Sequence, residues 1–133
     1  QYQQQPGLEF AARDVAVSDA LDAITMDIAP AYGAVPGLGF YRRRVQLSAN
    51  GLTLQEETDF SRTVALTLMS VEKPAVEGGI VQFGTLAAAH IKGFARIATE
   101  AVSITDSRLR QAWPDTLYRT RVYFRSTLTV EVR

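Results

Sequence analysis

Cysteine is absent from the 133 residues of this sequence, and histidine occurs only once, as His90. The lack of cysteine excludes disulfide scaffolds, thiol catalysis and cysteine-based zinc sites. A single histidine cannot supply a multi-histidine metal site or a two-histidine acid and base pair, and its apolar neighbours favour a structural role. We therefore predict that the chain holds no catalytic residue, no metal ligand and no cofactor.

An excess of charge of either sign is also missing. Fourteen Lys and Arg residues balance fourteen Asp and Glu residues, so no long-range field attracts nucleic acid or an anionic membrane. No apolar run approaches the roughly 20 residues that a membrane-spanning helix needs. We predict neither nucleic-acid nor membrane partners.

The basic residues are nearly all arginine, because Lys73 and Lys92 are the only lysines among the fourteen. Arginine suits fixed bidentate contacts with carboxylates or sulfates, although an ordinary arginine-rich surface is the alternative. Nucleotide-binding and nucleophile motifs are absent, since neither Gly-x-Ser-x-Gly nor Gly-Lys-Ser/Thr occurs. The first methionine is Met26, and we expect a longer polypeptide whose targeting segment lies upstream.

The residues that are present follow the pattern of an antiparallel β protein. Short runs with β-branched residues and period-two alternation are separated by Gly, Pro, Asn and Asp. Hydrophobic residues make up 47% of the chain, enough for one domain with its own core. We predict an all-β fold, an antiparallel β-sandwich with at most short helical turns, one of them within 107–113. Residues 1–7 are expected to form a linker and residues 8–133 a single domain.

Local signals define several strands. The clearest is a hairpin in which runs 40–47 and 52–60 flank Asn50-Gly51, a dipeptide that favours tight turns. Runs 86–91 and 95–99 are predicted to pair around Gly93. Runs 117–124 and 128–132 are predicted to form a final hairpin.

Two charged residues interrupt the apolar alternation of the first hairpin. Arg43 and Glu56 each fall on the face that otherwise carries apolar side chains. If Leu47 faces Leu52, then Arg43 lies directly opposite Glu56. We predict an inner salt bridge, and we expect the arginine to lower the pKa of Glu56, which opposes an acid or base role.

Four aromatic residues could form a platform for sugar rings. Apolar ring faces stack on flat ligands, and the candidates are Tyr32, Phe40, Tyr41 and Trp113. Core packing is the alternative use of most of them. Trp113 lies before a proline in a polar segment and is the best candidate to be exposed.

The order of several short motifs resembles a known family. The motifs are Met26-Asp27-Ile28-Ala29-x-Ala31-Tyr32, Arg43-x-Val45-x-Leu47, Leu52-x-Leu54-x-Glu56, Ile104-x-Asp106-x-Arg108-Leu109 with Trp113, and Leu117-Tyr118-Arg119. Together they resemble the C-terminal β region of heparinase II/III-like proteins, a family of bacterial polysaccharide lyases. The resemblance implies part of a β supersandwich, with an α/α toroid and further sandwich strands upstream as its partners. Glu56 departs from the pattern, where aspartate is more usual.

The resemblance also implies a role. Members of the family depolymerise uronic-acid polysaccharides by β-elimination, with the catalytic tyrosine and histidine and the zinc ligands upstream of this region, so none is transferred to this chain. β-Elimination needs a base to remove a proton, an acid for the leaving oxygen and a group that neutralises the uronate carboxylate. This chain could supply only the neutralising group.

We therefore expect a non-catalytic domain that braces the catalytic part and lines an acidic-polysaccharide groove with Tyr32, Arg42 and Arg44. The alternatives are a stand-alone carbohydrate-binding sandwich and a structural interaction domain with an exposed apolar patch.

Overall fold

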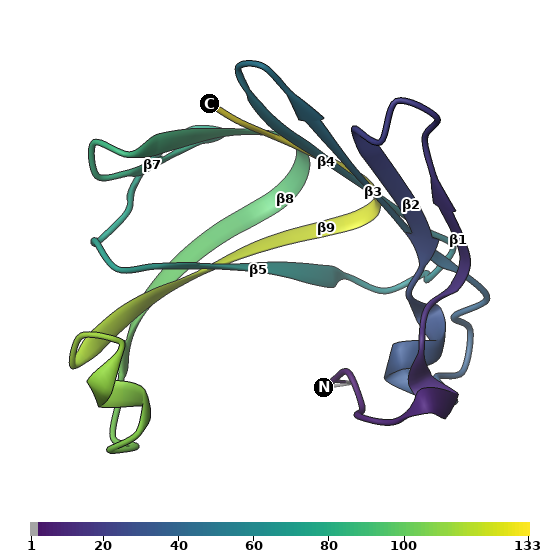
Figure 1. Ribbon diagram of the computed structural model, residues 1–133, viewed down its shortest axis with the longest axis horizontal. Helices are drawn as coiled ribbons and strands as arrows, with labels where there is room; N and C mark the ends of the chain where they lie inside the picture. Colours follow the sequence, from purple (N-terminus) through teal and green to yellow (C-terminus); the bar gives the residue numbers. More distant parts are fainter. Residues whose placement is uncertain (1–2) are drawn as a thin grey trace.

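The computed structural model describes residues 3–133 and shows an antiparallel β fold (Figure 1). Nine strands form one sheet in the order β1-β2-β3-β4-β9-β8-β7-β6, and β5 pairs with β9 outside this path. The strands are β1 (Arg13–Val17), β2 (Ala23–Asp27), β3 (Tyr41–Ser48), β4 (Gly51–Thr58), β5 (Val64–Ser70), β6 (Ala75–Glu77), β7 (Ile80–Phe83), β8 (Ala87–Ser103) and β9 (Thr116–Val132).

Helical structure in residues 3–133 is limited to short 3-10 turns. They are η1 (Leu8–Phe10), η2 (Ala29–Tyr32) and η3 (Leu109–Gln111). The predicted all-β antiparallel fold is confirmed, and η3 lies within the range 107–113 where a helical turn was predicted.

The two longest strands, β8 and β9, give the sheet its bent shape. They pair along most of their length, with register shifts between Lys92 and Arg96 that mark β-bulges, and bulges bend strands locally. The C-terminal half of β9 pairs with β4, whereas its N-terminal half pairs with β5. The sheet therefore divides into a large part, which contains β1 to β4, β6 and β7, and a three-stranded part made of β5 and the adjoining halves of β9 and β8.

The register of the first hairpin is confirmed. Leu47 lies opposite Leu52, and Arg43 lies opposite Glu56, as the alternation predicts. Period-two alternation determines which residues share a face once one cross-strand pair is known.

The predicted C-terminal hairpin is wrong, and so is the division of 86–99 into two strands. Each segment is one continuous strand, with Phe94 opposite Phe124 and Lys92 opposite Thr129. The polar residues 125–127 resemble a turn but form the bulge. Gly93 makes this possible, because its φ is +84° and a Cβ there would lie 2.7 Å from the carbonyl oxygen of Thr127.

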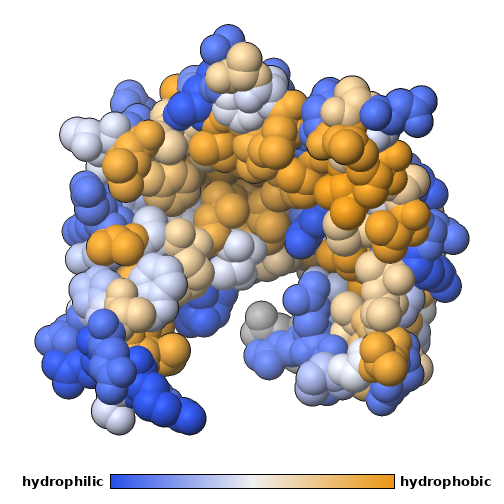
Figure 2. Space-filling view, in the orientation of Figure 1, coloured by the Kyte–Doolittle hydropathy of each residue, from blue (hydrophilic) through white to orange (hydrophobic). Residues whose placement is uncertain are grey.

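The core lies on the concave side of the bent sheet. Val122, Phe124 and Val130 of β9 are at most 1% exposed. Tyr41 packs edge-on against Phe124 and stacks on Tyr32, with ring centroids 6.4 and 5.9 Å apart. Figure 2 shows that the hollow above the three-stranded part is lined mainly by apolar residues and stays open on this face of the molecule. The core therefore covers the concave surface only in part.

The N-terminal segment runs along the edge of the fold. Residues 1–2 of the predicted linker 1–7 lie outside the described residues. The backbone N–H of Gln5 donates to the carbonyl oxygen of Ala31 over 2.6 Å. This bond attaches the segment to η2.

Candidate functional site

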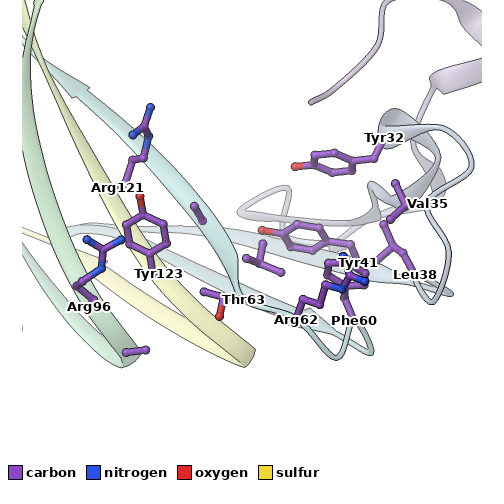
Figure 3. A pocket seen from close by; sticks show the side chains of 13 residues that line it. Tyr32, Val35, Leu38, Tyr41, Phe60, Arg62, Thr63, Arg96, Arg121 and Tyr123 are labelled. Carbon is purple, nitrogen blue, oxygen red and sulfur yellow. The ribbon is translucent and has the colours of Figure 1, made fainter. Parts of the chain in front are cut away.

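A pocket of about 690 Å³ opens between the segment that contains η2 and the outer face of the three-stranded part (Figure 3). Its lining residues include three tyrosines and three arginines and no carboxylate. The six are Tyr32, Tyr41, Tyr123, Arg62, Arg96 and Arg121. A volume of this size falls within the range of small-molecule sites, roughly 300–1,000 Å³. The composition provides aromatic surfaces together with positive charge.

One wall of the pocket is aromatic. The rings of Tyr32 and Tyr41 are stacked with an interplanar angle of 12°, and Figure 3 shows both hydroxyls directed toward the opposite wall. Burial raises the pKa of both tyrosines above the ordinary value. Both hydroxyls therefore stay protonated near neutral pH. The half-buried Tyr32 can donate a hydrogen bond to a ligand oxygen, whereas Tyr41 is 2% exposed and packs in the core.

Asp27 holds this wall in place. Its Oδ1 accepts the backbone N–H groups of Ala29 and Tyr41 over 3.0 and 2.8 Å, and Arg13 Nε donates to its Oδ2 over 2.7 Å. Burial opposes the charge of Asp27, but these donors outweigh it and lower its pKa. One carboxylate thus joins the start of η2 to the start of β3, which positions Tyr32 against Tyr41.

The opposite wall carries the positive charge. Arg121 and Tyr123 alternate along β9 and therefore share its outer face, and Arg96 of β8 lies opposite Tyr123. The Arg96 guanidinium stacks on the Tyr123 ring, 4.1 Å from its centroid. Arg121 Nη1 lies 3.0 Å from Glu100 Oε1. Stacking holds the Arg96 guanidinium on the pocket wall before any ligand arrives, whereas the ion pair holds Arg121 beside Glu100, which does not line the pocket.

Two of the three arginines have no carboxylate nearby to balance their charge. Among the described residues, neither Arg62 nor Arg96 lies within ion-pair distance of a carboxylate. Arg62 is exposed at the rim, next to the start of β5. The pocket is therefore net positive in spite of the neutral chain.

The three residues predicted to bind substrate do not come together. Tyr32 lines the pocket, whereas Arg42 and Arg44 are not among the lining residues. Both alternate with Arg43 and occupy the other face of β3, where Arg42 pairs with Glu57 over 3.0 Å. Arg44 lies beside Thr25.

Sequence reasoning missed Arg96 and Arg121, which come from strands far from Tyr32 in the chain. A signal was available in the alternating polar face Arg119, Arg121, Tyr123 and Arg125. That alternation shows which side of the strand is polar, but not which loop faces it.

The predicted inner salt bridge is present. Arg43 Nη2 and Nε lie 2.6 and 2.8 Å from Glu56 Oε1, and the Glu56 side chain is completely buried. The expected lowering of the Glu56 pKa is wrong, because burial raises it despite the arginine. Glu56 Oε2 has no hydrogen-bond partner among the described residues. One satisfied oxygen does not compensate for the removal of the whole carboxyl from water.

The remaining candidates lie apart from the pocket. His90 is exposed on β8, opposite Ile80 and Glu131. Trp113 is 49% exposed beyond η3, which confirms its expected exposure. Residues 3–133 contain no cluster of three potential metal-ligating side chains and no helix long and apolar enough to cross a membrane.

No protein-family model fits the sequence, and no curated protein is significantly similar to it.

Proposed function

We propose that this chain is a non-catalytic β domain that binds an acidic polysaccharide in the pocket between Tyr32 and Arg96. The observation that carries the proposal is the lining itself: three arginines and three tyrosines without a carboxylate. A uronic-acid residue presents one carboxylate, several hydroxyls and apolar ring faces, and each has a complementary group here. The resemblance to heparinase II/III-like proteins supports the same ligand class.

The two walls would divide the recognition of a uronate. Arg96 and Arg121 would bind the carboxylate, because guanidinium groups form paired, charge-assisted hydrogen bonds with it. The hydroxyl of Tyr32 would donate to a sugar oxygen, and the buried Tyr41 would support the Tyr32 ring from below. Because Tyr123 already supports Arg96, the ligand would meet a preorganised site.

Isothermal titration calorimetry with a uronic-acid oligosaccharide tests the proposal, with a neutral oligosaccharide of equal length as the reference ligand. The acidic ligand should bind more tightly than the neutral one. Arg96→Gln and Arg121→Gln should each weaken binding about tenfold or more, because a hydrogen bond to a charged group contributes about 1.5–3 kcal/mol. Arg44→Gln, a matched change on the other face of β3, should leave binding unchanged. Equal affinity for the two ligands would contradict the proposal.

A second role as a brace for a neighbouring domain is favoured by the open concave face. Val17 and Leu47 lie on the inner side of the large part and are 55% and 58% exposed, and Figure 2 shows the apolar lining around the hollow. Exposed apolar patches of this kind mark interaction sites. In a polysaccharide lyase, the catalytic part would cover this face.

Binding of an apolar fluorescent dye to the folded chain tests the brace. Replacing Val17 and Leu47 together by glutamine should reduce the fluorescence without lowering the unfolding temperature. Arg96→Gln controls for attraction of an anionic dye to the pocket and should leave the fluorescence unchanged. A folded chain that binds no dye would argue against an exposed docking face.

A further inference from the structure

The sheet has three open edges among the described residues, formed by β1, β6 and β5. Native proteins protect such edges with charges, prolines, bulges or short length. The edge strand β1 has a bulge between Arg13 and Ala16 and a charged residue, Asp14, with a φ of 53°. The edge strand β6 has three residues and follows Pro74. These two edges are poor templates for another strand.

The edge of β5 has none of these protections. Its seven residues, Val64–Ser70, contain no charge, proline or glycine, and their pairing with β9 is regular from Val64 opposite Phe124 to Ser70 opposite Tyr118. Among the described residues, the strand pairs only with β9, and no other backbone hydrogen bond involves it. Its second edge therefore presents unpaired N–H and C=O groups in a straight row.

We propose that β5 pairs antiparallel with β5 of a second copy of this chain, about a two-fold axis at Thr67. The strand is self-complementary in this register. Leu66 would lie opposite Leu68 of the other copy on the inner face, and Ala65 opposite Met69 on the outer face. Cross-strand pairs of matched chemistry stabilise antiparallel ladders, and a shift by one residue would place inner side chains opposite outer ones.

The charges that flank β5 support a second copy as the partner. Arg62 lies five residues before Thr67, and Glu72 lies five residues after it. A two-fold axis at Thr67 would therefore place Arg62 of one copy beside Glu72 of the other copy. Both residues are exposed. Neither forms an ion pair within the described part of its own chain. The two-fold symmetry would create two such opposite-charge contacts at the ends of the ladder.

Sedimentation velocity over a dilution series of the 133-residue chain tests the proposal. The wild-type chain should show a monomer–dimer equilibrium. Thr67→Lys and Thr67→Glu should each raise the dissociation constant about fivefold or more, because like charges would stand directly opposite at the axis. An equimolar mixture of the two variants should dimerise more tightly than either alone, because Lys would then face Glu.

Two further variants test whether the dimer forms through β5. Glu72→Lys should weaken the dimer by bringing two positive charges together. Thr127→Lys places the same charge on an exposed strand residue inside the β4–β9 ladder and should leave the equilibrium unchanged. A wild-type chain that stays monomeric throughout the series would overturn the proposal, as would a Lys and Glu mixture no tighter than the single variants. Arg62, Val64 and Ala65 belong both to the proposed dimer contact and to the pocket lining, but these measurements use no saccharide, so their outcome does not depend on saccharide binding.

Discussion

Removal of either partner of the Arg43 and Glu56 pair should destabilise the fold by unequal amounts. The Glu56 side chain is 0% exposed and Arg43 is 26% exposed. Arg43→Met would leave a fully buried carboxyl without its cation, whereas Glu56→Leu would leave an arginine that still reaches water. The arginine substitution should therefore cost more.

The magnitudes follow from this difference in burial. Leaving a buried charge without its partner costs about 3–5 kcal/mol, and Arg43→Met should fall near that range at neutral pH. Glu56→Leu should cost about 1–2 kcal/mol, because a partly exposed arginine keeps some hydration. Leucine would also pack well there, since Glu56 lies opposite Leu128 of β9. The double variant Arg43→Met with Glu56→Leu should recover most of the loss.

The pH dependence provides a second readout. A carboxyl whose folded pKa is raised stabilises the fold at pH values below its unfolded pKa, and this contribution is lost as the pH rises through the folded value. Burial raises the pKa of Glu56 above its ordinary 4.5. The cost of Arg43→Met should therefore shrink as the pH falls toward 4.5, because the stranded carboxyl of Glu56 takes up a proton.

Urea unfolding followed by circular dichroism measures all of these free energies. Equal losses for the two single variants would refute the reasoning from burial. A double variant as unstable as the sum of the singles would show that the two side chains do not interact. A pH-independent cost for Arg43→Met would show that Glu56 stays ionised.

Three other changes test separate features of the fold. Asp27→Asn should destabilise the chain by about 1–3 kcal/mol. Because the pKa of Asp27 is lowered, the wild-type chain should lose stability as the pH falls through that pKa, and the Asn variant should not show this loss. Urea unfolding at several pH values measures both effects. Gly93→Ala should cost about 1–3 kcal/mol because of its φ of +84° and the nearby Thr127 carbonyl, whereas Gly37→Ala, with a φ of +81° and no atom within 4 Å, should cost less in the same assay. The isolated chain should release no ultraviolet-absorbing unsaturated uronate from heparin or alginate, and a turnover that His90→Ala abolishes would show that the histidine is catalytic.

Local sequence patterns were sufficient for part of the structure. The alternation in 40–60 and the Asn50-Gly51 turn determined the register of the first hairpin, and with it the contact between Arg43 and Glu56. These features depend on residues close together in the chain, where period-two geometry leaves few choices. The overall β class followed from the same pattern.

Other features depend on contacts between distant segments. Residues 125–127 are polar and exposed, so they resemble a turn, but pairing with β8 on one side and with β4 and β5 on the other keeps β9 continuous. The pocket brings Tyr32 close to Arg96 and Arg121. These residues are far apart in the chain, so their spacing in the sequence does not predict that they lie close together. The direction of the Glu56 pKa shift depends on how deeply the side chain is buried, and the alternation of residues does not predict that depth.

Chemical-shift mapping of a labelled chain titrated with a uronic-acid oligosaccharide locates the binding site residue by residue. If the oligosaccharide binds in the pocket, the shifts should cluster on both walls, at Tyr32 on one side and at Arg96, Arg121 and Tyr123 on the other. Shifts confined to the opposite face of β3, around Arg42 and Arg44, or no shifts at saturating ligand, would contradict binding in the pocket.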